Sequence, residues 1–139
     1  MTERTGRCLC GAVTIKLRND PIVARTCWCR LCQYAAAGNA TVNGVFKRED
    51  VEISGPLKSV ESMPDSGYLK YLQFCPECGT QVGVRSTRSD DIYVVRLGVL
   101  DQRDIAPEAT IWTSSAPDWA CISDAIPDFA EGAPPPVKN

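Results

Sequence analysis

The sequence predicts an all-β domain stabilised by zinc, and three features of the chain support this prediction. Short segments of alternating apolar and polar residues are separated by frequent Gly, Pro, Asn and Asp turns. No segment has the length and periodicity of a long amphipathic helix. The chain has eight cysteines and no histidine in 139 residues, and most of the cysteines occur at spacings typical of metal ligands.

The predicted elements follow this alternation along the chain. Residues 1–7 are predicted to be a polar lead-in, and residues 33–37 one short helical turn that Gly38 ends. Strands are predicted at residues 12–18, 39–46, 51–53, 68–74, 81–85, 92–100 and 109–113. Residues 63–67 are the expected tip of a hairpin. The 92–100 strand is the most β-prone and is expected at the centre of its sheet.

A single zinc-binding domain is predicted at residues 1–130, because a chain of 139 residues suits one core and nothing divides it. The Pro-rich residues 131–139 are predicted to form a flexible tail. Three late aromatic residues, Trp112, Trp119 and Phe129, are expected to belong to the core.

Composition and charge exclude several classes of partner. The formal net charge is −2 with both signs interspersed, so no nucleic acid is expected to bind. No apolar run approaches the length of a membrane span and the N-terminus is polar, so no membrane partner is expected and a cytoplasmic location is predicted. Thiols stay reduced in the cytoplasm, and metal binding therefore explains the cysteines better than disulfides do.

The absence of histidine limits the chemistry further. It excludes Ser–His and Cys–His nucleophile pairs as well as imidazole metal ligands. Any metal site must then consist of thiolates, with carboxylates as the one addition. All-sulfur ligation favours zinc, with an iron–sulfur cluster as the less favoured occupant.

Four cysteines form two knuckles that lie far apart in the sequence. Cys8 and Cys10 precede Gly11, and Cys75 and Cys78 also precede a glycine. Brought together, the four thiolates fill the tetrahedral coordination of one zinc ion and leave no open position, so this site is predicted to be structural. Buried free cysteines or disulfides are less favoured, because cysteines that merely pack seldom cluster at ligand spacings.

Three more cysteines, Cys27, Cys29 and Cys32, lie within six residues. Three thiolates around one zinc leave a fourth position for a substrate atom, which is the feature that separates catalytic from structural zinc. Such a site suits an exogenous thiol, whose pKa the metal lowers. Two alternatives stay open at this stage: the cluster is a second structural or empty site, or one of Cys27 and Cys29 joins Cys75 and Cys78.

The order of these motifs resembles the glutathione-dependent formaldehyde-activating enzyme family, which includes centromere protein V. The resemblance covers nearly the whole chain: C-L-C-G-A-V at 8–13, C-W-C-R-L-C at 27–32, residues 46–55, F-C-P-E-C-G-T at 74–80, I-W at 111–112 and residues 119–129.

This resemblance implies an all-β zinc fold known as a β-tent, which is shared with methionine sulfoxide reductase B. It implies that Cys8, Cys10, Cys75 and Cys78 hold a structural zinc ion, and that Cys27, Cys29 and Cys32 hold a catalytic one. The implied activity is that of a carbon–sulfur lyase that adds glutathione to formaldehyde. The family commonly has histidine where this chain has Trp28, and a tryptophan has no lone pair for a metal and cannot transfer a proton at neutral pH.

Two functions from different classes therefore remain. The first is a zinc-dependent enzyme that adds a small-molecule thiol such as glutathione to a small aldehyde, with Arg25 and Arg30 as candidates to bind the carboxylates of the thiol. The second is a zinc-stabilised binding or scaffold module whose second metal site is vestigial. Methionine sulfoxide reductase activity is disfavoured, because it needs a spare redox cysteine and only Cys121, which is expected to pack, is left over.

Overall fold

A computed structural model describes residues 2–134 and confirms the all-β class. The strands are β1 (Arg4–Arg7), β2 (Thr14–Leu17), β3 (Val23–Cys27), β4 (Thr41–Lys47), β5 (Val51–Ser54), β6 (Lys58–Ser62), β7 (Lys70–Phe74), β8 (Gln81–Ser86), β9 (Ser89–Arg96) and β10 (Ala109–Ile111). One helix, α1 (Arg30–Ala35), and three single turns of 3-10 helix at Arg48–Asp50, Leu97–Val99 and Thr113–Ser115 complete the described elements.

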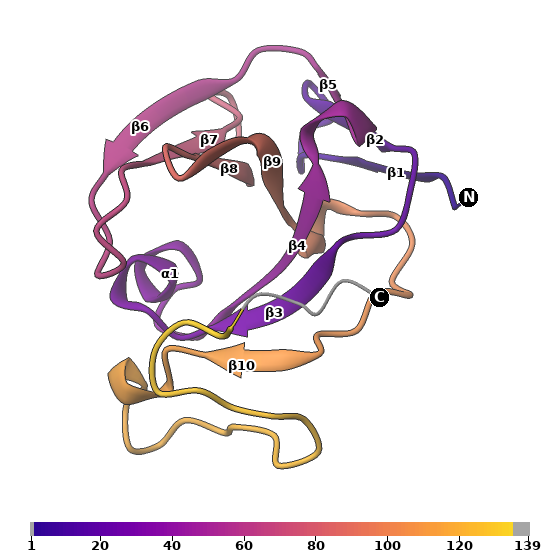
Figure 1. Ribbon diagram of the computed structural model, residues 1–139. Helices are drawn as coiled ribbons and strands as arrows, with labels where there is room; N and C mark the ends of the chain where they lie inside the picture. Colours follow the sequence, from indigo (N-terminus) through magenta and orange to yellow (C-terminus); the bar gives the residue numbers. More distant parts are fainter. Residues whose placement is uncertain (1, 135–139) are drawn as a thin grey trace.

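The strands form two sheets (Figure 1). A three-stranded sheet has the order β1-β2-β5, and a seven-stranded sheet has the order β10-β3-β4-β9-β8-β7-β6. Every pair is antiparallel except β10 and β3, which run parallel. In Figure 1 the large sheet curves from β10 and β3 at the bottom to the β6–β7 hairpin at the upper left, with α1 between these two ends.

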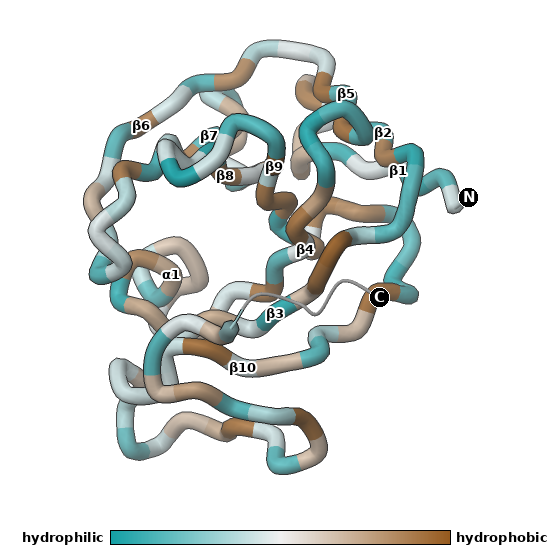
Figure 2. The backbone as a smooth tube through the Cα atoms, in the orientation of Figure 1, coloured by the Kyte–Doolittle hydropathy of each residue, from teal (hydrophilic) through white to brown (hydrophobic). Residues whose placement is uncertain are grey.

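The main core lies where the small sheet meets the large one. Its largest fully buried side chains include Tyr93, Phe46 and Leu17, and the Cys8 and Cys75 thiols belong to the same cluster. Figure 2 shows hydrophobic residues along β3, β9 and β10. In β9 they form a continuous run, Ile92 to Val95, as expected for a strand at the centre of its sheet. Within residues 2–134, no helix is both long and apolar enough to cross a membrane.

Most of the predicted strands and the hairpin are present, and β9 is the central strand of the large sheet as predicted. The prediction for 92–100 was wrong at its end, because the strand stops at Arg96 and a 3-10 turn, Leu97–Val99, follows. Three strands were missed: β1, β3 and β6, the last of which (Lys58–Ser62) pairs with β7 in the hairpin whose tip and second strand were predicted. The β3 strand ends in the cysteine cluster itself, and β1 lies within the expected polar lead-in.

The β1 strand escaped prediction because its buried positions carry Arg4 and Gly6 rather than apolar side chains. Arg4 is 5% exposed and pairs with Asp20 at 3.0 Å and with Asp104 at 2.8 Å. A Cβ atom at Gly6 would lie 2.4 Å from the Val99 carbonyl oxygen, so this strand position accepts only glycine. Buried and exposed positions do alternate in β1, but its buried positions carry an arginine and a glycine, which sequence patterns do not count as buried.

The C-terminal segment corrects two expectations about burial. Trp119 is 64% exposed rather than part of the core, and the Cys121 side chain is exposed rather than packed. Residues 135–139 of the predicted tail lie outside the described residues. In the described part, the Trp112 amide donates to the Glu131 carbonyl at 2.9 Å, and Arg25 donates to the Pro134 carbonyl at 3.3 Å.

We predict that Asp104→Asn removes part of the acid sensitivity of folding. The hydrogen bonds from Arg4 lower the pKa of Asp104 below its usual value. Because the folded pKa is the lower one, the carboxylate stabilises the fold above the unfolded pKa of about 3.9, and this contribution is lost as the pH falls through the folded pKa. Thermal unfolding between about pH 3 and pH 7 should show a lower Tm at neutral pH and a flatter acid limb in the variant. Asp118→Asn, an exposed change, is the control and should leave both features unchanged.

Candidate metal centres

The first cysteine group joins the two sheets. Cys8 and Cys10 lie in the turn between β1 and β2, and Cys75 and Cys78 lie in the turn between β7 and β8. Their sulfur atoms all lie within 4.8 Å of one another. The Cys8–Cys10 sulfur separation is 3.6 Å and the Cys10–Cys75 separation is 3.8 Å. Four thiolates at about 2.3 Å from one tetrahedral zinc ion lie about 3.8 Å apart, so the donor set and its spacing fit zinc.

Both knuckles are held by their own backbones. The Gly11 amide donates to the Cys8 carbonyl at 3.1 Å, and the Gly79 amide donates to the Cys75 carbonyl at 2.8 Å. Both glycines have positive φ, +82° at Gly11 and +75° at Gly79, which other residues rarely adopt. The two knuckles touch directly, since the Leu9 amide donates to the Thr80 hydroxyl at 3.1 Å.

Thr80 also acts on the cysteine that precedes it. Hydrogen bonds from the Thr80 side chain, and then from its backbone, lower the pKa of Cys78 to about 5. A thiol with so low a pKa is a thiolate at neutral pH, which is the form that binds metals. The closed four-sulfur arrangement leaves no vacant position, which fits a structural ion.

The second group is built from the end of β3 and the first turn of α1. Cys27 is the last residue of β3, Cys29 is the N-cap of α1, and Cys32 lies in its first turn. The Cys32 amide donates to the Cys29 sulfur at 3.4 Å. The three sulfurs lie within 4.8 Å of one another, and the side chains are only 6%, 7% and 7% exposed. The first-turn geometry therefore turns three sequence neighbours toward one point.

The structure thus separates the seven cysteines into the four-sulfur and the three-sulfur group, and Cys27 and Cys29 do not join Cys75 and Cys78. Their roles as ligands stay predictions, because grouping alone does not show a bound ion. Sequence analysis also proposed two arginines beside the cluster, Arg25 and Arg30, and the structure places them differently. Arg25 lies two residues before Cys27 on β3, so their side chains share one face of the strand. Arg30 instead stacks on Tyr34 and donates to Gln33.

A buried arginine that sequence analysis missed contacts the three-sulfur group. Arg96 is 8% exposed, and its Nη1 atom lies 3.9 Å from the Cys32 sulfur. The guanidinium is held by Asn43 at 2.8 Å and by Gln81 at 3.1 Å. Among the described residues it forms no ion pair with a carboxylate. Its natural counter-charge is therefore the thiolate group, since an isolated buried cation is costly.

The pKa values of the three thiols in the three-sulfur group shift in different directions. Hydrogen bonds from Cys27 and Cys29, and then the positive charge of Arg96, lower the pKa of Cys32 to about 2. The same contacts, with Cys29 first, raise the pKa of Cys27. The positive charge of Arg96 favours a thiolate within this group.

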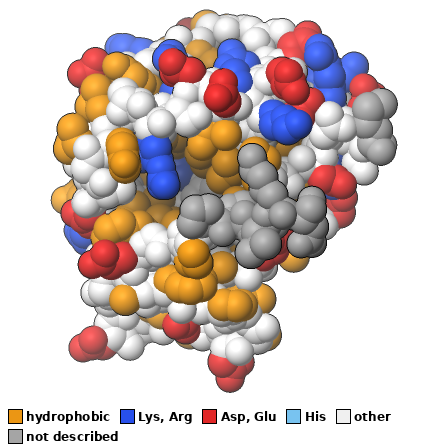
Figure 3. Space-filling model, viewed as in Figure 1, with side chains coloured by type: hydrophobic (Ala, Val, Ile, Leu, Met, Phe, Trp, Pro, Cys, Tyr) orange, Lys and Arg blue, Asp and Glu red, His pale blue; other side chains and the backbone are white. Residues whose placement is uncertain are grey.

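Lys70 is a second cation that sequence analysis missed. It is half-buried on β7, donates to Ser86 at 3.1 Å, and is close enough to the three cysteines to feel their charge. Burial, and then the charge of Arg88, lowers the pKa of Lys70. Figure 3 shows the molecule from the side seen in Figure 1, where hydrophobic side chains gather in the middle and charged side chains lie around the upper rim.

Trp28, between the first two cysteines of the group, points elsewhere. It is 2% exposed, and its ring packs edge-on against Trp119 at 6.4 Å. The Gln33 amide joins the Trp28 carbonyl at 2.6 Å to the Ser115 carbonyl at 2.9 Å, which ties α1 to the C-terminal segment. Trp28 therefore anchors that segment, while Leu31, Ile111 and Trp112 are the residues that pack against the sulfurs.

Comparison with known proteins bears on both family and fold. A family model described as "Glutathione-dependent formaldehyde-activating enzyme" matches residues 3–115. Among solved structures, the chain is similar to a crystal structure of a Rhodobacter sphaeroides protein, with a TM-score of 0.57 and 18% sequence identity. The alignment covers 90% of this chain and 99% of that one, and at this identity it bears on the fold alone. No curated protein matches.

We predict that protein purified without chelator carries about two zinc ions per chain, and that Cys29→Ser/Cys32→Ser carries about one. Elemental analysis measures both values. An absorption spectrum free of iron–sulfur bands is expected alongside, because the sulfur spacing fits zinc. Cys121→Ser, which changes an exposed cysteine outside both groups, is the control and should retain both ions. Equal zinc content in wild type and double variant would contradict a metal site at the three-sulfur group.

We also predict that Arg96→Gln weakens zinc binding at the three-sulfur group by about 10- to 100-fold, as loss of a partner beyond the direct ligands commonly does. Three thiolates and one Zn²⁺ carry a net charge near −1, and Arg96 compensates it in a buried setting. Competition with a chromogenic chelator measures the affinity. Arg96→Lys should recover part of it, and Arg30→Gln should leave it unchanged. An unaltered affinity in Arg96→Gln would show that its charge is not used.

Proposed function

The chain belongs to the glutathione-dependent formaldehyde-activating enzyme family, and from this premise we propose that it adds a thiol such as glutathione to a small aldehyde such as formaldehyde. The three-sulfur group would hold the catalytic zinc ion and the four-sulfur group the structural one. The observation that carries the proposal is the set of three buried sulfurs within 4.8 Å of one another. We propose a cytoplasmic location for this reaction.

Three thiolates suit the reaction because they leave one coordination position for the substrate. A zinc ion so held supplies one effect when bound: it lowers the pKa of a thiol that occupies the open position. Cys27, Cys29 and Cys32 would bind the ion, and Arg96 would keep the charged group compatible with burial. The apolar wall of Leu31, Ile111 and Trp112 would exclude water from the sulfurs.

The proposed addition is balanced without any redox partner. A carbon–sulfur bond forms between the thiol sulfur and the aldehyde carbon, the carbonyl π bond opens, and the oxygen becomes a hydroxyl. The thiol loses one proton and the oxygen gains one. The chain has no histidine, and Trp28 packs against Trp119 away from the sulfurs, so this proton is proposed to pass through water.

An anionic peptide thiol would also need cations that are not already paired. Lys70 and Arg25 meet this need: both are half-buried, and within residues 2–134 neither forms an ion pair with a carboxylate. The Arg25 Nε atom is buried without a hydrogen-bond partner in the same part of the chain. Arg88, close to both, adds positive charge at the edge of this region. This set supports recognition of substrate carboxylates beside the sulfurs.

The alternative is that the chain is a zinc-stabilised binding or scaffold module without catalytic activity. A measurement of turnover distinguishes this alternative from the proposed enzyme. Because thiols add to formaldehyde slowly on their own, the rate must be measured above the uncatalysed background, for which exchange NMR is suited. We expect the zinc-loaded wild type to exceed the background and Cys29→Ser/Cys32→Ser to match it. Wild type that carries both ions but adds no rate with glutathione would favour the scaffold.

We predict that Lys70→Gln raises the KM for glutathione by about tenfold, the size of one charge-assisted hydrogen bond, and changes kcat little. The KM for a neutral thiol such as 2-mercaptoethanol should change much less, because that thiol has no carboxylate. Lys58→Gln, on the exposed β6 strand, is the matched control. Equal effects on both thiols would assign Lys70 to the fold rather than to carboxylate binding.

A further inference from the structure

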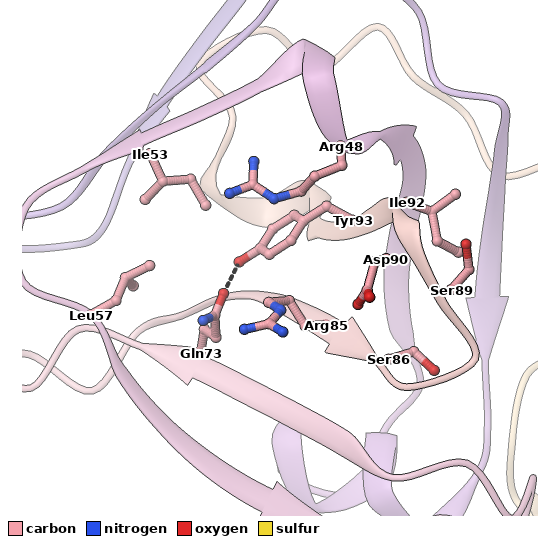
Figure 4. Close-up of a pocket in the computed structure, with 10 residues that line it drawn as sticks. All are labelled: Arg48, Ile53, Leu57, Gln73, Arg85, Ser86, Ser89, Asp90, Ile92 and Tyr93. Atoms are coloured by element: carbon pink, nitrogen blue, oxygen red, sulfur yellow. Dashed lines mark hydrogen bonds between the residues drawn. The ribbon is translucent and has the colours of Figure 1, made fainter.

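A cavity of about 450 Å³ lies apart from both cysteine groups (Figure 4). Its size falls within the range of small-molecule sites, which is roughly 300–1,000 Å³. None of its lining residues is a cysteine. The lining consists of Arg48, Ile53, Leu57, Gln73, Arg85, Ser86, Ser89, Asp90, Ile92 and Tyr93.

The floor of the cavity is fixed by a chain of hydrogen bonds. The Tyr93 hydroxyl donates to Gln73 Oε1 at 2.7 Å, and Gln73 Nε2 donates to Ser59 at 3.2 Å. Tyr93 is only 2% exposed, and its ring lies over Gly83, where an added Cβ would approach its Cε1 atom to 2.3 Å. Only a glycine at position 83 on β8 leaves room for the Tyr93 ring. These contacts hold the floor of the cavity in place without a ligand.

Two arginines converge on this floor. In Figure 4 the guanidinium groups of Arg48 and Arg85 lie on either side of the Tyr93 ring, with Ile53 and Leu57 along one edge. Arg48 stacks over Tyr93 at 5.7 Å, and Arg85 stacks over Tyr71 at 5.3 Å. Arg48 Nη1 donates to the Val51 carbonyl at 3.0 Å. Stacking uses the flat face of a guanidinium, so the remaining N–H groups of Arg48 and those of Arg85 can bind an oxyanion.

The charges around the cavity do not balance. Within residues 2–134, neither Arg48 nor Arg85 forms an ion pair, and Asp90 is the one acidic residue of the lining. Both arginines act on the same phenol: burial raises the pKa of Tyr93 to about 12, and the two charges oppose that rise. Two like charges brought to one cavity repel each other, and a bound anion relieves the repulsion.

We propose that this cavity binds a small organic oxyanion, with its carboxylate or phosphate group between Arg48 and Arg85 and its apolar part against Ile53 and Leu57. Ser89 adds a hydroxyl to the same lining. The proposal does not depend on the proposed function. Tyr93 and Arg96 lie three residues apart on β9, so they occupy opposite faces of the strand, with the cavity on one face and the three-sulfur group on the other.

The test is titration of the zinc-loaded full chain with three probes, followed by backbone amide NMR. Phenyl phosphate and benzoate carry the two candidate oxyanions, and benzyl alcohol is the neutral control. We expect saturable shifts at the amides of Arg48, Arg85 and Ser89 with an oxyanion and not with the alcohol. The stronger of the two oxyanion probes identifies the preferred head group.

Substitutions test whether Arg48 and Arg85 bind the oxyanion. Arg48→Gln and Arg85→Gln should each weaken binding about tenfold, as expected for one charge-assisted contact. Arg18→Gln, which changes an exposed arginine just after β2, should not change it. The proposal is overturned if neither oxyanion gives saturable shifts, if benzyl alcohol binds equally well, or if Arg18→Gln weakens binding as much as the cavity variants do.

Discussion

The four-sulfur group is the constraint on which the rest of the fold depends. Cys8 and Cys10 belong to a turn of the small sheet, and Cys75 and Cys78 belong to a turn of the large sheet. Within residues 2–134, no strand of the small sheet pairs with a strand of the large one. The backbone of β1 does contact the segment that follows β9, through the isolated bridge between Gly6 and Leu100 and the hydrogen bond from the Asp101 amide to the Thr5 carbonyl at 2.8 Å. A metal ion bound by the four sulfurs would add a link between a turn of each sheet. For a chain this small, such a link contributes a large share of the folding free energy.

The two sulfur groups differ in ways that follow from their surroundings. In the four-sulfur group, the Val13 amide donates to the Cys8 sulfur at 3.3 Å, and the Thr80 hydroxyl lies 3.2 Å from the Cys78 sulfur. All three cysteines of the three-sulfur group are buried, whereas Cys10 of the four-sulfur group is exposed, and the three-sulfur group has Arg96 as a fixed cation. A buried guanidinium held by Asn43 and Gln81 cannot move away when the charge on the sulfurs changes. It therefore favours the thiolate form, which is the form of cysteine that binds metals.

The sequence revealed the cysteine groups because ligand spacing is a local property. It also revealed most strands, because their apolar residues alternate. It did not reveal β1, where the buried Arg4 pairs with the carboxylate of Asp104, which lies 100 residues away in the sequence. Arg96 did leave a trace, since a charged residue within the apolar, β-prone 92–100 segment is unusual. That signal predicts a buried partner but cannot say that the partner is Cys32, because their contact is made only when β9 and α1 come together.

The position of Trp28 shows why a substitution inside a metal-binding motif need not alter the metal site. The sulfurs of Cys27 and Cys29 converge on one point, while the residue between them is directed toward the C-terminal segment. A histidine at this position would reach the same segment unless the backbone turned. What the tryptophan changes is packing: its large ring gives Trp119 a partner and, with Gln33, fixes the C-terminal segment to α1.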